Sequence, residues 1–396
     1  MNKICVIGGG ASGIMAALSA AKNGAKVTVF EGNEELGKKI LRTGNGKCNF
    51  SNLNMTSEVY NCDSDSFVEN ILSKYGLDEL LLYLSRLGLL IKEKNGYLYP
   101  YSEQARSVRD VFEAELRSLC VNVRTSSYVN MLTKDETGGF LVSVEGIKER
   151  EHFDKVILCT GGKAGLLKNF DIKITPLEAG LTKINCKEDF LKDLDGIRAE
   201  ANVSLYYENT LLSEEYGEVL FREKGISGIC VFILSSLCKN NELSLGKYSL
   251  KLDLFPGFDE EDLKKTLEMR FLVNAEKNVK DFFKGLFCDG LNDLTIKQGN
   301  LDPQALITSV GADRIIDTIL KMRELNLTPV SKAGFDNAQV TVGGVETDEL
   351  TDNLESKKVP GLYVCGELVN VDGPCGGYNL QWAFSSGAIA GEHACY

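Results

Sequence analysis

Residues 4–13 read Ile-Cys-Val-Ile-Gly-Gly-Gly-Ala-Ser-Gly, and this stretch decides the fold of the N-terminal region. The four apolar residues predict a short buried strand, and the small residues from Ala11 to Asn23 predict a helix that ends at Gly24. Residues 26–30, Lys-Val-Thr-Val-Phe, supply a second parallel strand. Because the three elements form a βαβ unit, we expect an α/β protein with a Rossmann-type domain.

Gly8, Gly10 and Gly13 form a Gly-x-Gly-x-x-Gly fingerprint between the first strand and its helix. The first glycine permits a tight turn, the second lets backbone amides reach a pyrophosphate, and the third lets helix and strand pack closely. Glu31 ends the second strand, where a carboxylate accepts hydrogen bonds from adenosine ribose hydroxyls. The pattern therefore predicts a bound dinucleotide, with its pyrophosphate at the positive end of the helix dipole.

Later segments favour FAD over NAD as this dinucleotide. Residues 128–153 alternate apolar and polar like an antiparallel meander, and the strand at 156–162 that follows ends in Thr-Gly-Gly. Residues 360–367, Pro-Gly-Leu-Tyr-Val-Cys-Gly-Glu, form a strand that can place a carboxylate by the ribityl and phosphate groups of a flavin. The glycine-rich loop 372–377 then opens a helix over about 379–393. The N-terminus of that helix can point at the flavin pyrimidine edge, where negative charge accumulates on reduction.

The length and charge of the chain limit its organisation and partners. With 396 residues it is too long for one ordinary core, so we expect two or three domains. The 44 Lys and Arg against 56 Asp and Glu give a net charge of −12. Such an acidic molecule is repelled by phosphate backbones, and no basic run interleaved with aromatics offsets this. We therefore expect no nucleic-acid partner.

Other features point to a cytoplasmic protein without metal or membrane. The apolar run before Gly8 is too short for a signal peptide or a membrane span, and no later stretch reaches a spanning length. The 12 cysteines are scattered and none falls in Cys-x-x-Cys spacing, so we expect reduced thiols. The two histidines, His152 and His393, have no Cys or His cluster near them, which argues against a zinc site.

The predicted secondary structure changes in character along the chain. Residues 186–256 read as a β-rich insert and residues 257–330 as a helical one, with a helix expected to start at Asp302-Pro303. The glycine-rich, buried-strand character of the beginning returns after about residue 331. We therefore expect one FAD-binding domain built from residues 1–185 and 331–396.

The chain resembles the BaiN/YhiN family of FAD-dependent oxidoreductases, some members of which are labelled aminoacetone oxidase. The matching stretches are residues 8–13, 37–49, 225–228, 338–345 and 361–391, the last with the core Asp-Gly-Pro-Cys-Gly-Gly-Tyr-Asn-Leu-Gln at 372–381. The resemblance implies a flavin domain similar to that of glutathione reductase, with an inserted β-barrel-like module and a helical module.

The chain departs from this family after the Thr-Gly-Gly strand. Similar proteins carry a second glycine-rich segment and a helix there, before a proline-containing strand. Here only Lys163 to Thr175 separate Gly162 from Pro176, so that segment is deleted. FAD binding at the two chain ends should survive, whereas the deletion puts substrate preference and turnover in question.

The fingerprint and the matching stretches together predict the cofactor-binding residues. They are Gly8, Gly10, Ala11, Ser12, Gly13, Glu31, Gly32, Lys39, Arg42, Thr43, Gly44, Lys47, Cys48, Asn49, Thr160, Gly161, Gly162, Gly366, Glu367, Gly376, Gly377, Tyr378, Asn379 and Leu380.

Catalytic residues are not defined by the sequence. Tyr378 or Glu367 can serve as a proton donor near the flavin, although either is more often a structural hydrogen-bonding group. Cys375 and Cys48 lie in motif loops as a conceivable redox pair, but small packed thiols are the preferred interpretation. The cations Arg42 and Lys47 suit the FAD phosphates, with a surface loop as the alternative.

The function predicted from these features is that of an FAD-dependent oxidoreductase acting on a small organic substrate. Because only one Gly-x-Gly-x-x-Gly occurs, NAD(P)H would reduce the flavin without a dedicated nicotinamide domain. The alternatives are a flavin oxidase that uses oxygen and a flavoprotein that no longer turns over. Two further rivals are an NAD-binding regulatory protein and a flavin-dependent RNA-modification partner. The sequence leaves the oligomeric state open.

Overall fold

The βαβ unit expected at the N-terminus is present in the structure, a computed structural model that describes residues 2–396. Strand β1 (Lys3–Ile7) pairs in parallel with β2 (Lys26–Phe30), and α1 (Ala11–Lys22) connects them. Gly24 follows the helix with a φ of +86°, a backbone conformation that glycine adopts without strain. The sequence therefore predicted this unit to within one or two residues.

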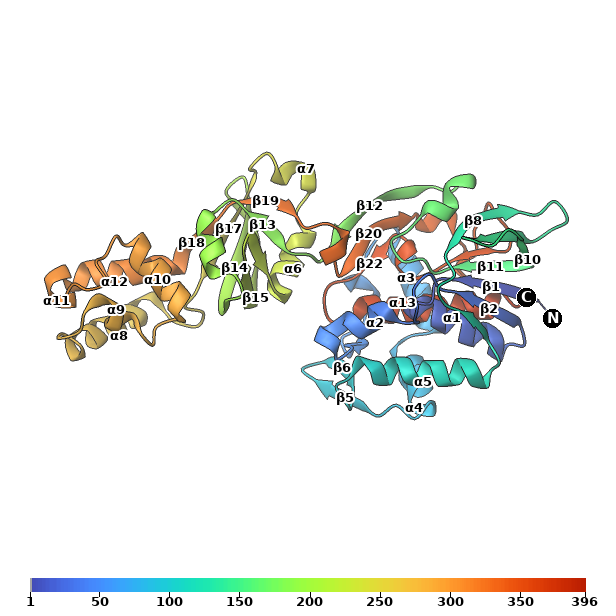
Figure 1. Cartoon of the computed structure of the whole chain (residues 1–396), viewed down its shortest axis with the longest axis horizontal. Helices are drawn as coiled ribbons and strands as arrows, with labels where there is room; N and C mark the ends of the chain where they lie inside the picture. Colours follow the sequence, from blue (N-terminus) through green and yellow to red (C-terminus); the bar gives the residue numbers. More distant parts are fainter. Residues whose placement is uncertain (1) are drawn as a thin grey trace. The chain divides into compact units, whose positions relative to one another are not determined.

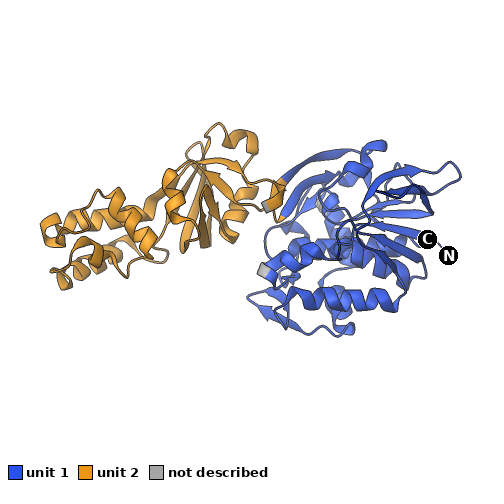
Figure 2. Ribbon diagram, in the orientation of Figure 1, with its two compact units in different colours: residues 1–178, 340–396 blue, residues 179–339 orange. Residues whose placement is uncertain are grey.

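The chain divides into two compact units, shown in Figure 2. Unit 1 comprises residues 1–178 and 340–396, and unit 2 comprises residues 179–339. The boundaries predicted at 185/186 and 330/331 thus lie inside unit 2. The reason is that β13 (Ile184–Cys186) and β19 (Pro329–Lys332) pair with each other and extend the sheet of the insert.

Unit 1 is built on a five-stranded parallel sheet in the order β21-β11-β1-β2-β7, with helices α1 and α13 among its cover (Figure 1). The meander expected around 128–153 is present as the three-stranded sheet β8-β9-β10. Besides those already given, the elements of unit 1 are α2 (Lys38–Arg42), β3 (Ser51–Asn52), β4 (Asn61–Cys62), α3 (Asp65–Lys74), α4 (Leu77–Arg86), β5 (Ile91–Lys94), β6 (Tyr97–Pro100), α5 (Ala105–Ser118), β7 (Asn122–Arg124), β8 (Val129–Lys134), β9 (Phe140–Val144), β10 (Glu151–Phe153), β11 (Lys155–Leu158), β12 (Ile174–Gly180, its end in unit 2), β20 (Val340–Val345), β21 (Leu362–Val364), β22 (Val371–Asp372) and α13 (Tyr378–His393).

Helix α13 packs very closely on α1, which brings the end of the chain to the fingerprint. A Cβ on Gly387 would overlap the carbonyl oxygen of Ser12, and one on Gly391 would overlap that of Ala16. The two glycines lie four residues apart and therefore on one face of the helix. This glycine face allows the two backbones to touch.

Unit 2 combines a seven-stranded sheet, in the order β18-β17-β14-β15-β16-β13-β19, with a set of helices. The strand pairings along this sheet are antiparallel. One continuous cluster of buried apolar side chains contains residues of both the sheet and the helices. Its further elements are β14 (Arg198–Tyr207), β15 (Thr210–Arg222), β16 (Gly225–Ser227), α6 (Ile229–Ser236), α7 (Asn240–Leu243), β17 (Tyr248–Asp253), α8 (Glu260–Val273), α9 (Val279–Phe283), α10 (Asp289–Gln298), α11 (Ile307–Val310), α12 (Ala312–Leu320) and β18 (Leu325–Leu327).

The helix expected to start at Asp302-Pro303 was wrongly placed. Asp302 Oδ1 accepts a hydrogen bond from the Gln304 amide at 3.0 Å, which closes a turn, and the first helix begins only at Ile307. Gly311, with a φ of +95°, then separates α11 from α12. The Asp-Pro pair, which was interpreted as the N-cap and first residue of a helix, therefore forms a turn instead.

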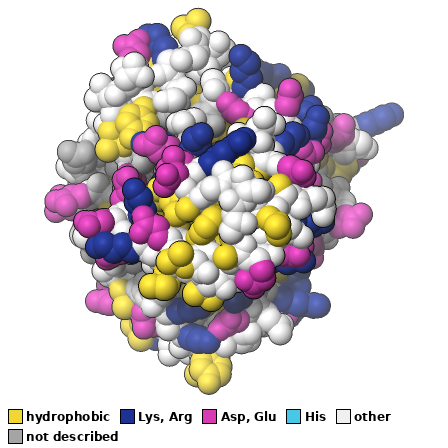
Figure 3. Space-filling view, turned by 90° about the vertical axis from the view of Figure 1, so that its left-hand side faces the viewer, with side chains coloured by type: hydrophobic (Ala, Val, Ile, Leu, Met, Phe, Trp, Pro, Cys, Tyr) yellow, Lys and Arg dark blue, Asp and Glu magenta, His cyan; other side chains and the backbone are white. Residues whose placement is uncertain are grey.

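Helix α8 has one buried and one exposed apolar face. Leu263, Leu267 and Phe271 are buried, whereas Met269 and Leu272 are 63 % and 70 % exposed. Figure 3 shows apolar side chains among charged ones on the face viewed there. Across residues 2–396, no helix has both the length and the apolar character that crossing a membrane requires.

Candidate functional site

The predicted site residues of both chain ends meet at the carboxyl edge of the parallel sheet. Strand β1 lies between β11 and β2, so the chain leaves β1 and β11 at the point where the strand order reverses. The ladder continues past the strands, because the Cys159 amide donates to Ile7 O at 2.8 Å and the Cys365 amide to Leu158 O at 3.1 Å. Ligands of open α/β sheets bind in the crevice at such a switch point.

The fingerprint glycines are packed as their roles require. Gly8 has a φ of +104°, and a Cβ there would overlap the carbonyl oxygen of Cys159. A Cβ on Gly13 would overlap Gly8 O, so the helix touches the turn directly. A Cβ on Gly10, in contrast, would meet no atom within 4 Å, which leaves open space before the helix.

The N-terminus of α1 is open to an anion. Gly10 is its N-cap, no side chain caps it, and its first turn, with Ala11 and Ser12, carries no acid. A helix of 12 residues presents its free N–H groups and the positive end of its dipole there. These features suit a pyrophosphate.

Glu31 is buried and holds the loop that follows β2. One carboxylate oxygen, Oε2, accepts from the Gly9 amide at 2.7 Å. The other, Oε1, accepts from the amide and the Nδ2 of Asn33 at 2.7 and 2.6 Å. The carboxylate thus connects the fingerprint to the loop at Gly32, at the place where an adenosine ribose is expected.

Lys39 and Glu367 join the two chain ends. Lys39 Nζ lies 2.8 Å from both carboxylate oxygens of Glu367. Oε1 of Glu367 also accepts from the Thr341 amide at 2.7 Å. A Cβ on Gly161 would lie 3.4 Å from Glu367 Oε2, and one on Gly162 would overlap Thr341, so the Thr-Gly-Gly segment reaches the same place.

Gly366 and Thr160 are also held near this edge. A Cβ on Gly366 would lie 2.5 Å from Ser12 Oγ, and the Gly366 amide donates to Ser386 Oγ at 2.9 Å. Thr160 Oγ1 donates to Lys163 O at 2.7 Å. Gly366, Ser12 and Ser386 therefore link the end of β21 to both α1 and α13.

The polar groups of the loop 42–49 differ in their surroundings: one is exposed, others have partners within the protein, and one is buried without a partner. Arg42 is exposed at the end of α2, while Lys47 Nζ pairs with Glu103 at 3.0 Å. Thr43 Oγ1 donates to Ile40 O at 2.7 Å. Asn49 Oδ1 is buried and has no hydrogen-bond partner among the described residues. An acceptor left unpaired inside the protein is costly unless a ligand donor meets it.

The second glycine-rich loop is fixed by its own side chains. Asn379 Nδ2 donates to Gly373 O at 2.6 Å, and the Gly373 amide donates back to Asn379 Oδ1 at 2.9 Å. Gly377 has a φ of +93° and caps α13 without a side-chain hydrogen bond. Asn52 Nδ2 donates to Gly376 O at 3.1 Å. The helix N-terminus, with the half-buried Tyr378 and Leu380, is therefore also open.

Two groups near this loop were missed from the sequence. Gln381 is fully buried, accepts from Ser51 Oγ at 2.6 Å and donates to Gly76 O at 3.0 Å. Asp372 is 5 % exposed, and burial raises the pKa of its carboxyl group. Both lie inside the family stretch 372–381, so the signal was present, but only the tertiary structure shows that they are buried.

Of the two cysteines considered as a redox pair, Cys48 is buried and Cys375 is half-buried. Burial raises the pKa of Cys48 and of Cys375 to about 12, which disfavours the thiolate needed for exchange. Within residues 2–396, no group of three or more His, Cys, Asp or Glu side chains is arranged to hold a metal ion.

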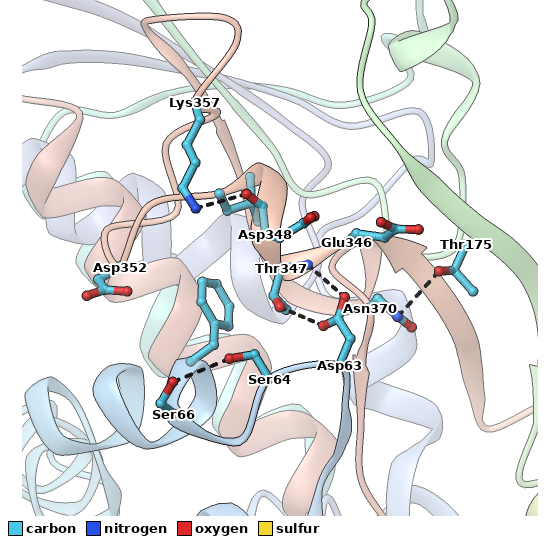
Figure 4. A pocket seen from close by; sticks show the side chains of 12 residues that line it. Asp63, Ser64, Ser66, Thr175, Glu346, Thr347, Asp348, Asp352, Lys357 and Asn370 are labelled. Carbon is cyan, nitrogen blue, oxygen red and sulfur yellow. Dashed lines mark hydrogen bonds between the residues drawn. The ribbon is translucent and has the colours of Figure 1, made fainter.

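A separate cleft of about 590 Å³ lies in unit 1 beside β20 and β22 (Figure 4). Its lining includes Asp63, Glu346, Asp348 and Asp352, and its lysine, Lys357, donates to the Asp348 carbonyl at 2.8 Å. None of the predicted cofactor-binding residues lines it. The surplus of carboxylates makes it unsuitable for phosphate groups.

The described residues at the carboxyl edge fit FAD. Two uncapped helix N-termini, the open space at Gly10 and the unpaired Asn49 Oδ1 are features that a ligand with a pyrophosphate and hydrogen-bond donors would complete. The residues that would hold it come from both ends of the chain, as expected for one domain interrupted by an insertion.

Comparisons with known proteins cover the whole chain. A family profile described as "HI0933-like protein Rossmann domain" matches residues 2–393. The 3-dehydro-bile acid delta(4,6)-reductase of Clostridium scindens is 35 % identical over 408 aligned positions, which cover 100 % of this chain and 99 % of that protein. The ribosomal RNA dihydrouridine synthase of Haemophilus influenzae is 28 % identical, with 96 % and 95 % covered.

A solved structure agrees with the fold. The 3-ketosteroid delta1-dehydrogenase from Sterolibacterium denitrificans matches with a TM-score of 0.54 and 10 % identity, covering all of both chains. This likeness shows that the two chains share a fold. The chain belongs to the HI0933-like family, of the BaiN/YhiN type, and is a flavin-dependent oxidoreductase with an FAD-binding Rossmann fold.

Proposed function

We propose that this flavoenzyme is a reductase that receives hydride from NAD(P)H, without a dedicated nicotinamide domain, and saturates an activated carbon–carbon double bond in a small organic substrate. The observation that carries the proposal is the full-length, 35 % identity to a 3-dehydro-bile acid delta(4,6)-reductase. A conjugated, polycyclic enone is therefore the first substrate class to test.

The names of the two relatives support the reaction type. A delta(4,6)-reductase removes carbon–carbon double bonds, and dihydrouridine is uridine with one carbon–carbon double bond reduced. Both changes add a hydride and a proton to an alkene conjugated with a carbonyl. The reaction class is thus shared by relatives whose substrates differ.

Some residues of unit 1 would bind FAD, and others would supply the proton that the substrate needs. The N-terminus of α1 would hold the pyrophosphate, and Glu31 would hold the adenosine ribose. FAD, when bound, supplies hydride transfer. The open N-terminus of α13 would favour negative charge on the flavin ring.

A proton source is needed beside the hydride. Burial raises the pKa of both Asp372 and Tyr378, so both side chains keep their protons to higher pH than in water. Glu367 accepts hydrogen bonds from Lys39 and from the Thr341 amide, so it suits the role of a carboxylate acceptor. Of the two candidates named from the sequence, Tyr378 is therefore the better proton donor.

A second candidate function is reduction of a uridine in RNA, which the dihydrouridine synthase relatives suggest. The net charge of −12 opposes it, because an RNA-binding protein normally neutralises phosphates with a basic surface. Retention of a radiolabelled ribosomal RNA fragment on a filter at low salt, lost at high salt, would favour this candidate.

The test is an absorbance spectrum of the purified protein, followed under anaerobic conditions. We expect two visible flavin bands that bleach when NADH or NADPH is added and return when a conjugated polycyclic enone is supplied. Bands that stay after nicotinamide addition, bleach when an organic substrate is added and return when oxygen is admitted would indicate an oxidase. Bands that no donor bleaches would indicate a flavoprotein without turnover.

A further inference from the structure

Two free thiols that are far apart in the sequence meet at the carboxyl edge of the parallel sheet. The Sγ atoms of Cys159 and Cys365 lie 3.2 Å apart. Cys159 is 5 % exposed and Cys365 is fully buried. Cysteines are scattered along the chain with no Cys-x-x-Cys spacing, so only the fold reveals this pair.

The backbone places the two residues opposite each other. Strands β11 and β21 pair in parallel with Val156 opposite Leu362 and Leu158 opposite Val364. The same register sets Cys159 opposite Cys365. Neighbouring strands lie about 4.8 Å apart, which falls inside the Cα separation of about 4.4–6.8 Å that a disulfide spans.

The pair also lies directly behind the pyrophosphate loop. The carbonyl oxygen of Cys159 fills the space that a Cβ on Gly8 would need, and Cys159 Cβ lies 3.2 Å from the position that a Cβ on Gly13 would take. On the other side, Ser12 contacts Gly366, the residue after Cys365. A movement of either cysteine is therefore transmitted to the turn and to the first residues of α1.

We propose that Cys159 and Cys365 form a reversible disulfide whose formation weakens FAD binding. The oxidant is a peroxide. The Cys159 thiolate attacks one peroxide oxygen, the O–O bond breaks, and Cys159 becomes a sulfenic acid as the first water leaves. The Cys365 sulfur then attacks the Cys159 sulfur, the S–O bond breaks, and the Cys365 proton leaves with the hydroxyl group as the second water. The S–S bond forms while the two thiols lose two protons and two electrons, and hydrogen peroxide leaves as two waters.

The two thiols have different roles: Cys159 reacts with the peroxide, and Cys365 closes the disulfide. Cys159 is the more accessible thiol and attacks first. Burial raises the pKa of Cys365 well above its usual range, which slows its reaction as it does for Cys48 and Cys375, but here the two sulfurs already lie 3.2 Å apart. Closing an S–S bond of about 2.05 Å draws the sulfurs together by about 1 Å. Because this movement occurs against the backbone of the fingerprint, it should distort the turn at Gly8. A strained disulfide of this kind is readily reduced by thiols.

The experiment uses the full-length holoprotein and apoprotein. Each is incubated with hydrogen peroxide, its remaining thiols are alkylated, and its peptides are analysed by mass spectrometry with and without reduction. We expect a cross-linked peptide containing Cys159 and Cys365, and about tenfold weaker FAD binding by fluorescence titration, restored by dithiothreitol. By linkage, saturating FAD should make the same disulfide about tenfold harder to form at equilibrium in a glutathione buffer.

The controls separate this pair from general oxidation. Cys365→Ser should retain its FAD affinity after peroxide treatment, whereas Cys120→Ser, which removes an exposed thiol, should behave like the wild type. Absence of the cross-link at peroxide doses that oxidise the exposed Cys120 and Cys288 overturns the proposal. A cross-link that leaves the FAD affinity unchanged overturns the coupling. Neither result depends on the substrate or on NAD(P)H, so a failure here is distinct from a failure of the proposed reaction.

Discussion

Lys39 Nζ and the carboxylate of Glu367 are 2.8 Å apart although the residues stand at opposite ends of the chain. The two side chains are 53 % and 21 % exposed, so the ion pair itself contributes little to stability. Its importance lies in its position. Together with the Thr341 amide, it gathers α2, β20 and the end of β21 at the edge where FAD is expected.

Lys39→Gln should weaken FAD binding by about tenfold, since it would remove a cation from the edge where the pyrophosphate is expected and free Glu367 to repel it. The free energy of unfolding of the apoprotein should change by less than about 1 kcal/mol. Fluorescence titration and urea denaturation measure the two effects.

Lys38→Gln is the matched control for this change, because Lys38 is exposed on the same turn and donates to Asn33 Oδ1 at 3.2 Å. Equal losses of affinity in the Lys38 and Lys39 variants would show that net charge alone matters. The specific role of Lys39 would then be wrong.

Glu31→Ala should destabilise the apoprotein by about 1–3 kcal/mol, because the buried Gly9 amide loses its acceptor. It should also weaken FAD binding, since the ribose loses the expected carboxylate. Urea denaturation checks the first effect and FAD titration the second. Glu34→Ala, at an exposed position of the same loop, should change neither. An unchanged FAD affinity in Glu31→Ala would contradict the assignment to the ribose.

Gly387→Ala and Gly391→Ala should each destabilise the protein by roughly 1–3 kcal/mol or more, because a methyl group would force α13 away from the backbone of α1. Thermal unfolding measures the loss. FAD affinity should fall as well, since Ser12 is one of the residues displaced.

Gly290→Ala is the control for helix glycines. Its methyl group would meet the end of the flexible Ile197 side chain, and alanine favours a helix by about 1 kcal/mol over glycine. We therefore expect little change or a small gain. A loss as large as that of the α13 variants would mean that the close approach to α1 is not the cause.

The pH dependence of stability should carry the signature of Asp372. Burial raises its pKa in the folded protein above the unfolded value of about 3.9, so the folded state holds the proton more strongly. Stability from this group is then fully present below about pH 4 and is lost as the pH rises through the folded pKa.

Asp372→Asn should therefore be more stable than the wild type at pH 7 and indistinguishable from it below about pH 4. Urea denaturation over this pH range checks the prediction. Asp352→Asn, at an exposed position, should show no such crossover. A destabilised Asp372→Asn at neutral pH would mean that the ionised carboxylate is required.

Local sequence determined much of this protein. The run of apolar residues 4–7, the glycines at 8, 10 and 13 and the alternation of residues 128–153 predict a strand, the turn after it and a meander from local sequence, and these elements are present in the structure. The family and the flavin chemistry also followed from such stretches. Helix ends were less certain, as Asp302 shows, because an acid before proline serves a turn as well as a helix.

Only the tertiary structure decided which distant residues meet. Lys39 and Glu367, Cys159 and Cys365, and Ser12 and Gly387 are brought together by the order of the parallel strands and the packing of two helices. No local pattern encodes these contacts, since strand register and backbone approach depend on the whole core. The physical reason is that side-chain chemistry is local, whereas burial and proximity are properties of the folded chain.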